Sequence, residues 1–237
     1  MIPRRREYAT SQPEEIIKPK SLDLVRRVAL FSPLTQEQAQ GVADNAFTRR
    51  FRRGEVVVEQ GKRSNALFIL LTGHARVLSA DSRGREVTLA ILQPGDYVGE
   101  MSLIDNEPHS ATVRAEVSTD MLVVGRADFA RCCLPESSSV AHALMHGLVQ
   151  RLRSANRQIE SLALLDVYGR VARALLDMSE MVGERRVIRK RVSRQDLAKV
   201  VGASREMVSR AMKDFEARGV VETEANGSVL LKNQLDN

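Results

Sequence analysis

The most constraining feature of the sequence is a run of heptad-spaced apolar residues between about Ser138 and Leu165. Apolar positions recur every seven residues in two series, and a member of the second series lies three residues after each member of the first. The first series is Met145, Leu152 and Ile159, and the second is Ala141, Leu148, Ala155 and Leu162. This spacing predicts one long helix with a narrow apolar stripe. Because so narrow a stripe covers little of a globular core, we expect it to pack against the same helix of a second chain. An amphipathic helix packed on its own domain is the alternative.

Short β-rich segments punctuated by glycines precede this helix, from Phe51 to about Val124. Glycine supplies the positive φ that tight turns need, and many short strands with regular turns are typical of a barrel, roll or sandwich. The expected strands are 56–58, 67–71, 75–78, 87–92, 111–113 and 121–124. Two short helices, over Ser21–Phe31 and Thr35–Ala46, are expected before them, with Thr35 as the N-cap of the second.

After the long helix, the pattern predicts a winged helix-turn-helix. A first helix is expected over Asp166–Met181, and a second begins at Ser193 and ends near Val201. Gly202 then makes a short turn into a third helix, which ends at Gly219. The expected elements of this last part are the helix 204–218 and the hairpin 220–231 with an Asn226-Gly227 turn.

The helix that begins at Ser204 has one apolar stripe and one charged side. Arginine can donate a fork of hydrogen bonds to guanine, and glutamate can accept from cytosine. The charged side therefore suits the major groove of DNA, although an ordinary solvated helix face is the alternative. A basic run from Glu184 to Arg194, directly before the helix pair, and a net charge of +6 favour a polyanionic partner. The candidate DNA-binding residues are Arg205, Glu206, Arg210, Ser204, Ser209, Lys213, Ser193, Arg189 and Arg191.

Four segments resemble the CRP/FNR family, and in particular its catabolite activator (cyclic AMP receptor) branch. They are GASREMVSR from Gly202, LALLDVYGRVA from Leu162, GDYVGEMSL from Gly95 and HSATVRA from His109. The resemblance covers roughly residues 21 to 232.

The resemblance implies an α+β chain with a jelly-roll-like, cyclic-nucleotide-binding-type β-roll, a dimerisation helix and a C-terminal winged helix-turn-helix. The expected boundaries are 1–20 for a flexible extension, 21–137 for the β-roll, 138–165 for the dimerisation helix and 166–237 for the DNA-binding domain. A homodimer would then use Met145, Leu148, Leu152, Ala155, Ile159 and Leu162. By resemblance, Arg205, Glu206 and Arg210 match the base-contacting residues of the family.

The resemblance also implies a ligand pocket in the β-roll, where a Gly-Glu pair and an Arg-Ser pair hold cyclic AMP. This chain keeps Gly99, Glu100 and Ser110 but has His109 in place of the arginine. A neutral imidazole does not replace a guanidinium fork, so we do not expect tight cyclic AMP binding. A cyclic nucleotide or cyclic di-GMP is left open as effector, and a surface-loop histidine without a ligand role is the alternative for His109. The candidate ligand-binding residues are Gly99, Glu100, Met101, His109, Ser110, Ala111, Ala155 and Asn156.

These features predict a sequence-specific transcription regulator that binds double-stranded DNA as a homodimer, with RNA polymerase as a partner if it activates. A cyclic-nucleotide signalling module acting on a protein partner is the alternative. We find no nucleophile–base pair, metal-ligand set or P-loop that would indicate an enzyme or a metal site. The sequence has no apolar run of the roughly 20 residues that a membrane span needs. Its two cysteines, Cys132 and Cys133, are adjacent, and neighbouring cysteines rarely form a disulfide. We therefore expect the protein in the reducing cytoplasm, away from membranes.

Overall fold

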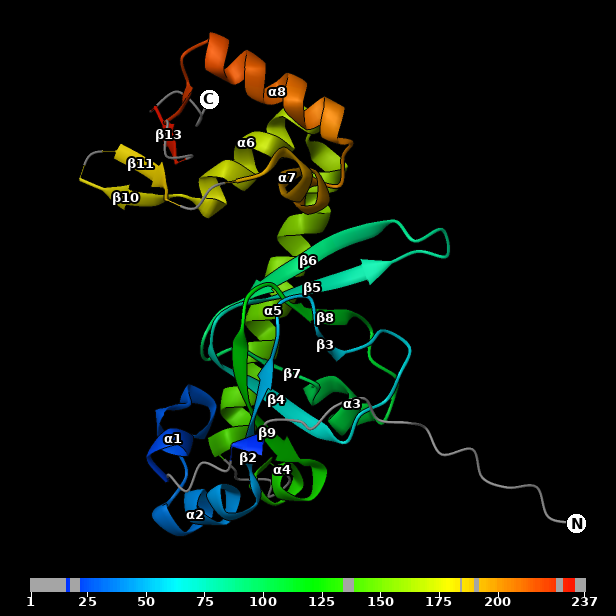
Figure 1. Cartoon of the computed structure of the whole chain (residues 1–237), viewed down its shortest axis with the longest axis vertical. Coiled ribbons are helices and arrows are strands. Elements are labelled where there is room, and N and C mark those ends of the chain that lie inside the picture. Colours follow the sequence, from blue (N-terminus) through cyan, green and yellow to red (C-terminus); the bar gives the residue numbers. More distant parts are fainter. Residues whose placement is uncertain are drawn as a thin grey trace, which may run out of the picture. The chain divides into compact units, whose positions relative to one another are not determined.

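The computed structural model describes residues 16–17, 22–133, 139–183, 185–189, 192–224 and 228–232. By its internal contacts the chain divides into two units. The first consists of Met1–Val77 and Ile91–Ala143, and the second of Leu78–Ala90 and Leu144–Asn237. Figure 1 labels most elements of the two units, which are described separately below.

The first unit contains two short α-helices and a 3₁₀ turn before β2 (Phe47–Phe51). The helix α1 spans Leu22–Arg27, a 3₁₀ turn spans Ala29–Phe31, and α2 spans Gln36–Asn45. Thr35 accepts a hydrogen bond from the Gln38 backbone, and the Gln38 side chain accepts one from the Thr35 backbone. This capping box satisfies two backbone donors at the start of α2, and it confirms Thr35 as the N-cap.

Two antiparallel sheets make up the β part, which is the expected β-roll (Figure 1). One sheet has the order β1 (Ile16–Ile17), β2 (Phe47–Phe51), β9 (Thr119–Gly125), β4 (Ala66–Thr72), β7 (Tyr97–Val98). The other has the order β3 (Val56–Val58), β8 (Thr112–Ala115), β5 (Ala75–Ala80), β6 (Glu86–Leu92). Their buried side chains form one apolar cluster that includes Phe51, Phe68, Leu70, Val113 and Met121. Removing this apolar surface from water favours the roll.

The strand β2 begins four residues before the β-rich texture of the sequence, at Phe47. The sequence did not predict this strand, because its two central arginines are equally compatible with a loop. In the structure, the Arg49 guanidinium lies 4.5 Å from the centre of the Phe51 ring. Arg50 forms an ion pair of 2.7 Å with Asp120 on β9, its cross-strand partner, and this hydrogen bond lowers the pKa of Asp120. Cross-strand pairing thus places two arginines in a strand.

Two helices of this unit were not expected from the sequence: α3 (Glu100–Asp105) and α4 (Arg126–Cys133). The first begins directly after Gly99, whose φ of 95° lies in the left-handed region. A Cβ atom at Gly99 would lie 2.6 Å from the Ala66 carbonyl oxygen, which is closer than real Cβ contacts. Glycine is therefore required at the point where the chain turns from β7 into α3.

The second unit contains most of α5 (Ser139–Leu164), followed by α6 (Val167–Met178), α7 (Arg194–Val201) and α8 (Arg205–Ala217). A four-stranded sheet has the order β10 (Glu180–Val182), β11 (Arg185–Ile188), β13 (Val229–Leu231), β12 (Val221–Thr223). The bounds of α5 lie within one residue of those expected. None of the helices that the structure describes is long and apolar enough to cross a membrane.

The sheet corrects one expectation and supports another. The helix expected to reach Met181 ends at Met178, because β10 begins at Glu180 and pairs with β11 inside the basic run. The strands β12 and β13 pair as the expected hairpin, with Thr223 opposite Val229. The Asn226-Gly227 turn lies outside the described residues.

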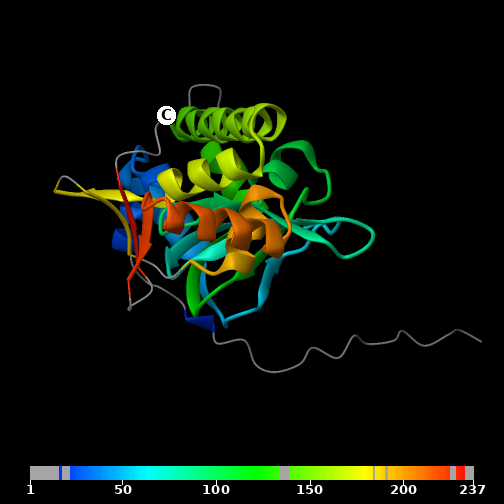
Figure 2. The ribbon, with the colours of Figure 1, turned by 90° about the horizontal axis from the view of Figure 1, so that it is seen from above.

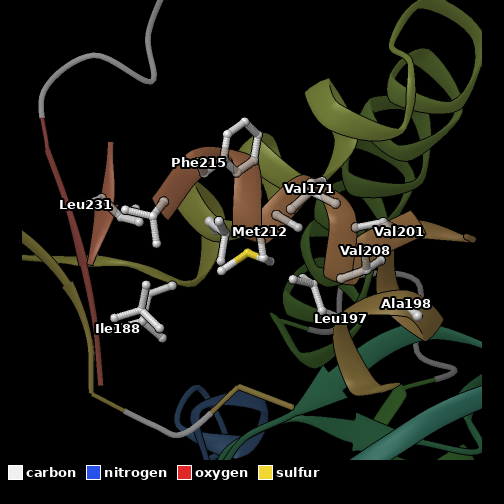
Figure 3. Close-up of a cluster of buried hydrophobic side chains, with 14 residues drawn as sticks. Val171, Ile188, Leu197, Ala198, Val201, Val208, Met212, Phe215 and Leu231 are labelled. Carbon is white, nitrogen blue, oxygen red and sulfur yellow. The ribbon is translucent and has the colours of Figure 1, made fainter. Parts of the chain in front are cut away.

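One apolar core joins α6, α7 and α8 (Figure 3). Val171 of α6, Leu197 of α7 and Met212 of α8 are fully buried in it. Tyr168 packs edge-on against Phe215, with ring centres 6.0 Å apart. The helices α6 and α8 lie side by side, and β12 and β13 lie beside the end of α8 (Figure 2). The sheet contributes Ile188 and Leu231 to the same core.

We predict that Met212→Ala lowers the free energy of unfolding by about 2–5 kcal/mol, because it leaves a cavity in this core. Urea denaturation of the full chain, followed by circular dichroism, measures the change. Met207→Ala is the matched control, since Met207 lies on the same helix but is 44% exposed while Met212 is 0% exposed. Equal losses for the two variants would contradict the assignment of this core.

Candidate functional site

Two helix caps set the geometry of the helix-turn-helix. The Ser193 hydroxyl accepts from the Asp196 backbone (3.0 Å) at the start of α7. Gly202 ends α7 with a φ of 63°, in the left-handed region, as its place in the turn requires. The Ser204 hydroxyl then accepts from the Met207 backbone (3.2 Å) and begins α8. Serine, glycine and serine thus fix the start and the end of α7 and the start of α8.

The helix α8 has a buried side and a polar side. Val208, Met212 and Phe215 point into the core, as Figure 3 shows. The opposite side forms a concave surface whose lining residues are Arg205, Glu206, Ser209, Arg210 and Lys213. The structure therefore brings together five of the predicted DNA-binding residues on one face, with three cations and one carboxylate among them.

Glu216 holds the far end of α8 in place, a role that the sequence analysis missed. Its Oε1 atom lies 3.1 Å from Arg194 Nη2 at the start of α7 and accepts from the Thr223 hydroxyl of β12 at 2.8 Å. One carboxylate thus links both helices of the motif with the wing, the hairpin of β12 and β13. Only tertiary proximity joins these three residues, so no local sequence pattern could have shown the link.

Three of the four remaining predicted DNA-binding residues have local partners. Arg189 forms an ion pair with Glu180 of β10, and both side chains are more than half exposed. The hydroxyls of Ser193 and Ser204 cap α7 and α8. Arg191 lies outside the described residues. Exposed ion pairs of this kind are weak, so Arg189 can exchange its partner at little cost.

In the first unit, the predicted ligand-binding residues lie around α3. Glu100 is a buried carboxylate in the first turn of this helix, directly after Gly99. Met101 and Ser110 are exposed, whereas Ala111 is buried. Burying a carboxylate is costly unless it has hydrogen-bonding or charged partners, so Glu100 needs such partners at this position.

His109 is buried, not exposed in a surface loop. It is 8% exposed, its Nε2 atom lies 2.9 Å from the Ser64 hydroxyl, and its Nδ1 atom lies 3.1 Å from the Ser102 hydroxyl. Burial lowers the pKa of His109 below its ordinary value, which favours the neutral imidazole. Both ring nitrogens therefore already have partners within the chain.

The two ligand-binding candidates from the long helix, Ala155 and Asn156, are exposed on α5 in the second unit. The predicted dimer residues lie on the same helix. Met145, Leu152, Ile159 and Leu162 are each more than half exposed, and Leu148 is half-buried. Ala155 is exposed among them. Exposed large apolar side chains at heptad spacing are unusual on a helix that packs only within its own chain.

Two family models match the chain. Residues 48–135 match the cyclic nucleotide-binding domain, and residues 169–234 match the Crp-like helix-turn-helix domain. The first match contains α3 and His109, and the second contains α7, α8 and the wing.

Curated relatives and solved structures agree with these matches. The chain is 33% identical over 189 residues to the cAMP-activated global transcriptional regulator Vfr of Pseudomonas aeruginosa, covering 77% of this chain and 88% of the relative. It is 34% identical over 194 residues to the cyclic AMP receptor protein of Thermus thermophilus, covering 81% and 87%. The c-di-GMP responsive global regulator CLP of Xanthomonas campestris superposes with a TM-score of 0.69 at 25% identity, covering 84% of this chain and 100% of that one.

The cap-and-core geometry of the helix-turn-helix, the β-roll and these matches lead to one conclusion: the chain belongs to the CRP/FNR family of DNA-binding transcription regulators.

Proposed function

We propose that this protein is a sequence-specific transcription regulator that acts as a homodimer on a two-fold DNA site, with half-sites resembling TGTGA and TCACA. The observation that carries the proposal is the polar face of α8, where Arg205, Glu206 and Arg210 lie together and exposed. The protein acts in the cytoplasm, where its DNA target lies, and it contacts RNA polymerase if it activates transcription.

The chemistry of this face fits base recognition in the major groove. Arg205 and Arg210 each read a guanine through O6 and N7, and Glu206 accepts from the amino group of a cytosine. These residues lie in the first half of α8, the part of a recognition helix that reaches base edges. Basic residues outside this face, such as Arg189, contact phosphates and carry no base preference.

The apolar stripe of α5 supports the homodimer. Met145, Leu152, Ile159 and Leu162 are exposed in the single chain. Burying such side chains against a second copy removes them from water at a gain of roughly 25 cal/mol per Å² of apolar surface. A two-fold dimer then presents two α8 helices to half-sites whose centres are about 10 base pairs apart.

A small molecule or cyclic (di)nucleotide in the β-roll is the proposed effector, held around Gly99, Glu100 and Ser110. Two relatives bear names that specify cyclic AMP, and the solved regulator CLP is described as responsive to cyclic di-GMP. His109 does not supply the guanidinium fork that holds a phosphate in the cyclic AMP receptor branch. We therefore place cyclic AMP among the weak ligands of this chain.

For DNA binding, we predict that Arg205→Ala or Arg210→Ala costs about 1–3 kcal/mol per half-site and relaxes the preference at one base pair. Selection from randomised half-sites, followed by gel-shift titration, measures both effects. The matched control is Arg218→Ala, which removes the same charge at the opposite end of α8, where Arg218 pairs with Asp214.

The control variant is expected to leave the selected motif unchanged. A motif that lacks the two guanines, or one that Arg205→Ala leaves intact, would show that α8 is not the recognition helix.

For assembly, we predict that the double variant Leu148→Glu and Leu152→Glu is monomeric, because unpaired charge in an apolar interface costs several kcal/mol. Sedimentation velocity of the full chain measures the change. Gln150→Glu adds a charge to the same helix off the apolar stripe and should leave the dimer intact. An unaltered dimer for the double variant would place the interface elsewhere.

For the effector, we predict that the unaltered protein does not bind cyclic AMP with submicromolar affinity, since position 109 provides no cation for the phosphate. Isothermal titration calorimetry with cyclic AMP measures the affinity. The thermogram is expected to show weak binding or none, and a submicromolar Kd would refute this view of the pocket.

A further inference from the structure

Four hydrogen bonds hold His109 within the first unit. Its backbone nitrogen donates to the Lys62 carbonyl and its carbonyl accepts from the Gly61 nitrogen, both at 2.8 Å. Its Nε2 atom lies 2.9 Å from the Ser64 hydroxyl. These three contacts attach His109 to the segment between β3 and β4. The fourth, between Nδ1 and the Ser102 hydroxyl, attaches it to α3.

Arg126 makes a second link between the same two parts of the chain. Its guanidinium donates to the carbonyls of Ser102 (3.0 Å) and Leu103 (3.1 Å) in α3, and its Nε atom donates to Asn65 Oδ1 at 3.3 Å. Its backbone nitrogen also donates to the Asn65 carbonyl at 2.9 Å. The helix α3 is thus held to the β3–β4 segment from two sides, by His109 and by Arg126.

We propose that His109 is a positioning residue of the sensor: through Ser102 it holds α3, and with it Gly99 and Glu100, in place before any effector binds. This inference rests on the proposed function of that site as the effector pocket. It gives position 109 a role inside the protein in place of a direct contact with a ligand phosphate.

The electrostatics of the position agree with this role. A neutral imidazole has one donor and one acceptor, and the two serine hydroxyls can accept from one nitrogen and donate to the other. The charged groups on the surrounding elements are engaged elsewhere: Arg126 donates to backbone carbonyls, and Arg63 lies 4.0 Å from Glu107. Glu100 is also engaged in an interaction within the chain. Turning the ring toward a ligand would break one buried and one partly buried hydrogen bond, which is costly.

Hydrogen exchange tests the proposal without DNA or effector, so its outcome is independent of whether the protein binds either. In the full effector-free chain, His109→Ala should raise the exchange rate of the α3 amides about tenfold, the factor expected from losing two neutral hydrogen bonds. His109→Gln, whose amide can still donate and accept, should restore part of the protection. His146→Ala is the matched control, since His146 is exposed on α5.

Two further measurements keep the proposal testable if His109→Ala does not fold. Ser64→Ala and Ser102→Ala each remove one partner of the ring and should each raise exchange in α3. In ¹⁵N spectra of the unaltered protein, the His109 ring should remain neutral below the ordinary pKa of a histidine, because burial lowers its pKa. Unchanged exchange in α3 for the folded variants, or a His109 ring that is protonated at the ordinary pKa of a histidine, would overturn the proposal.

Discussion

The proposed DNA-binding surface depends on the burial of one stripe of α8. Val208, Met212 and Phe215 are almost completely removed from water between α6, α7 and the wing. Because residues at this spacing occupy one side of a helix, burying them fixes the rotation of α8 about its axis. The opposite side, with Arg205 and Arg210, is then necessarily exposed. Apolar packing thus decides which polar groups α8 exposes.

A single carboxylate complements this packing. Glu216 contacts Arg194 of α7 and Thr223 of β12, so it joins the two helices of the motif with the wing. Packing alone tolerates small sliding movements, whereas hydrogen bonds at about 3 Å restrict direction as well as distance. Together, the core sets the rotation of α8 and Glu216 limits its shift along the neighbouring elements.

Polar contacts have the corresponding role in the β-roll. The helix α3 is short and follows Gly99, whose left-handed conformation brings the backbone against the Ala66 carbonyl. A helix of this length has little stability of its own. Its position depends on side chains from other segments, namely Arg126 on its carbonyls and His109 on Ser102. The family model for the cyclic nucleotide-binding domain covers all of these residues.

The sequence determined the features that repeat or that act locally. Heptad spacing set α5 to within one residue, serine and threonine caps set the starts of α2, α7 and α8, and the charge pattern of α8 identified its polar face. These depend on neighbours within one or two turns, which the sequence lists directly. The tertiary structure decided the rest: the arginine-bearing strand β2, the strand β11 within the basic run, the link made by Glu216 and the burial of His109. Each of these depends on groups that are far apart in the chain, and only folding brings those groups within hydrogen-bonding or packing distance.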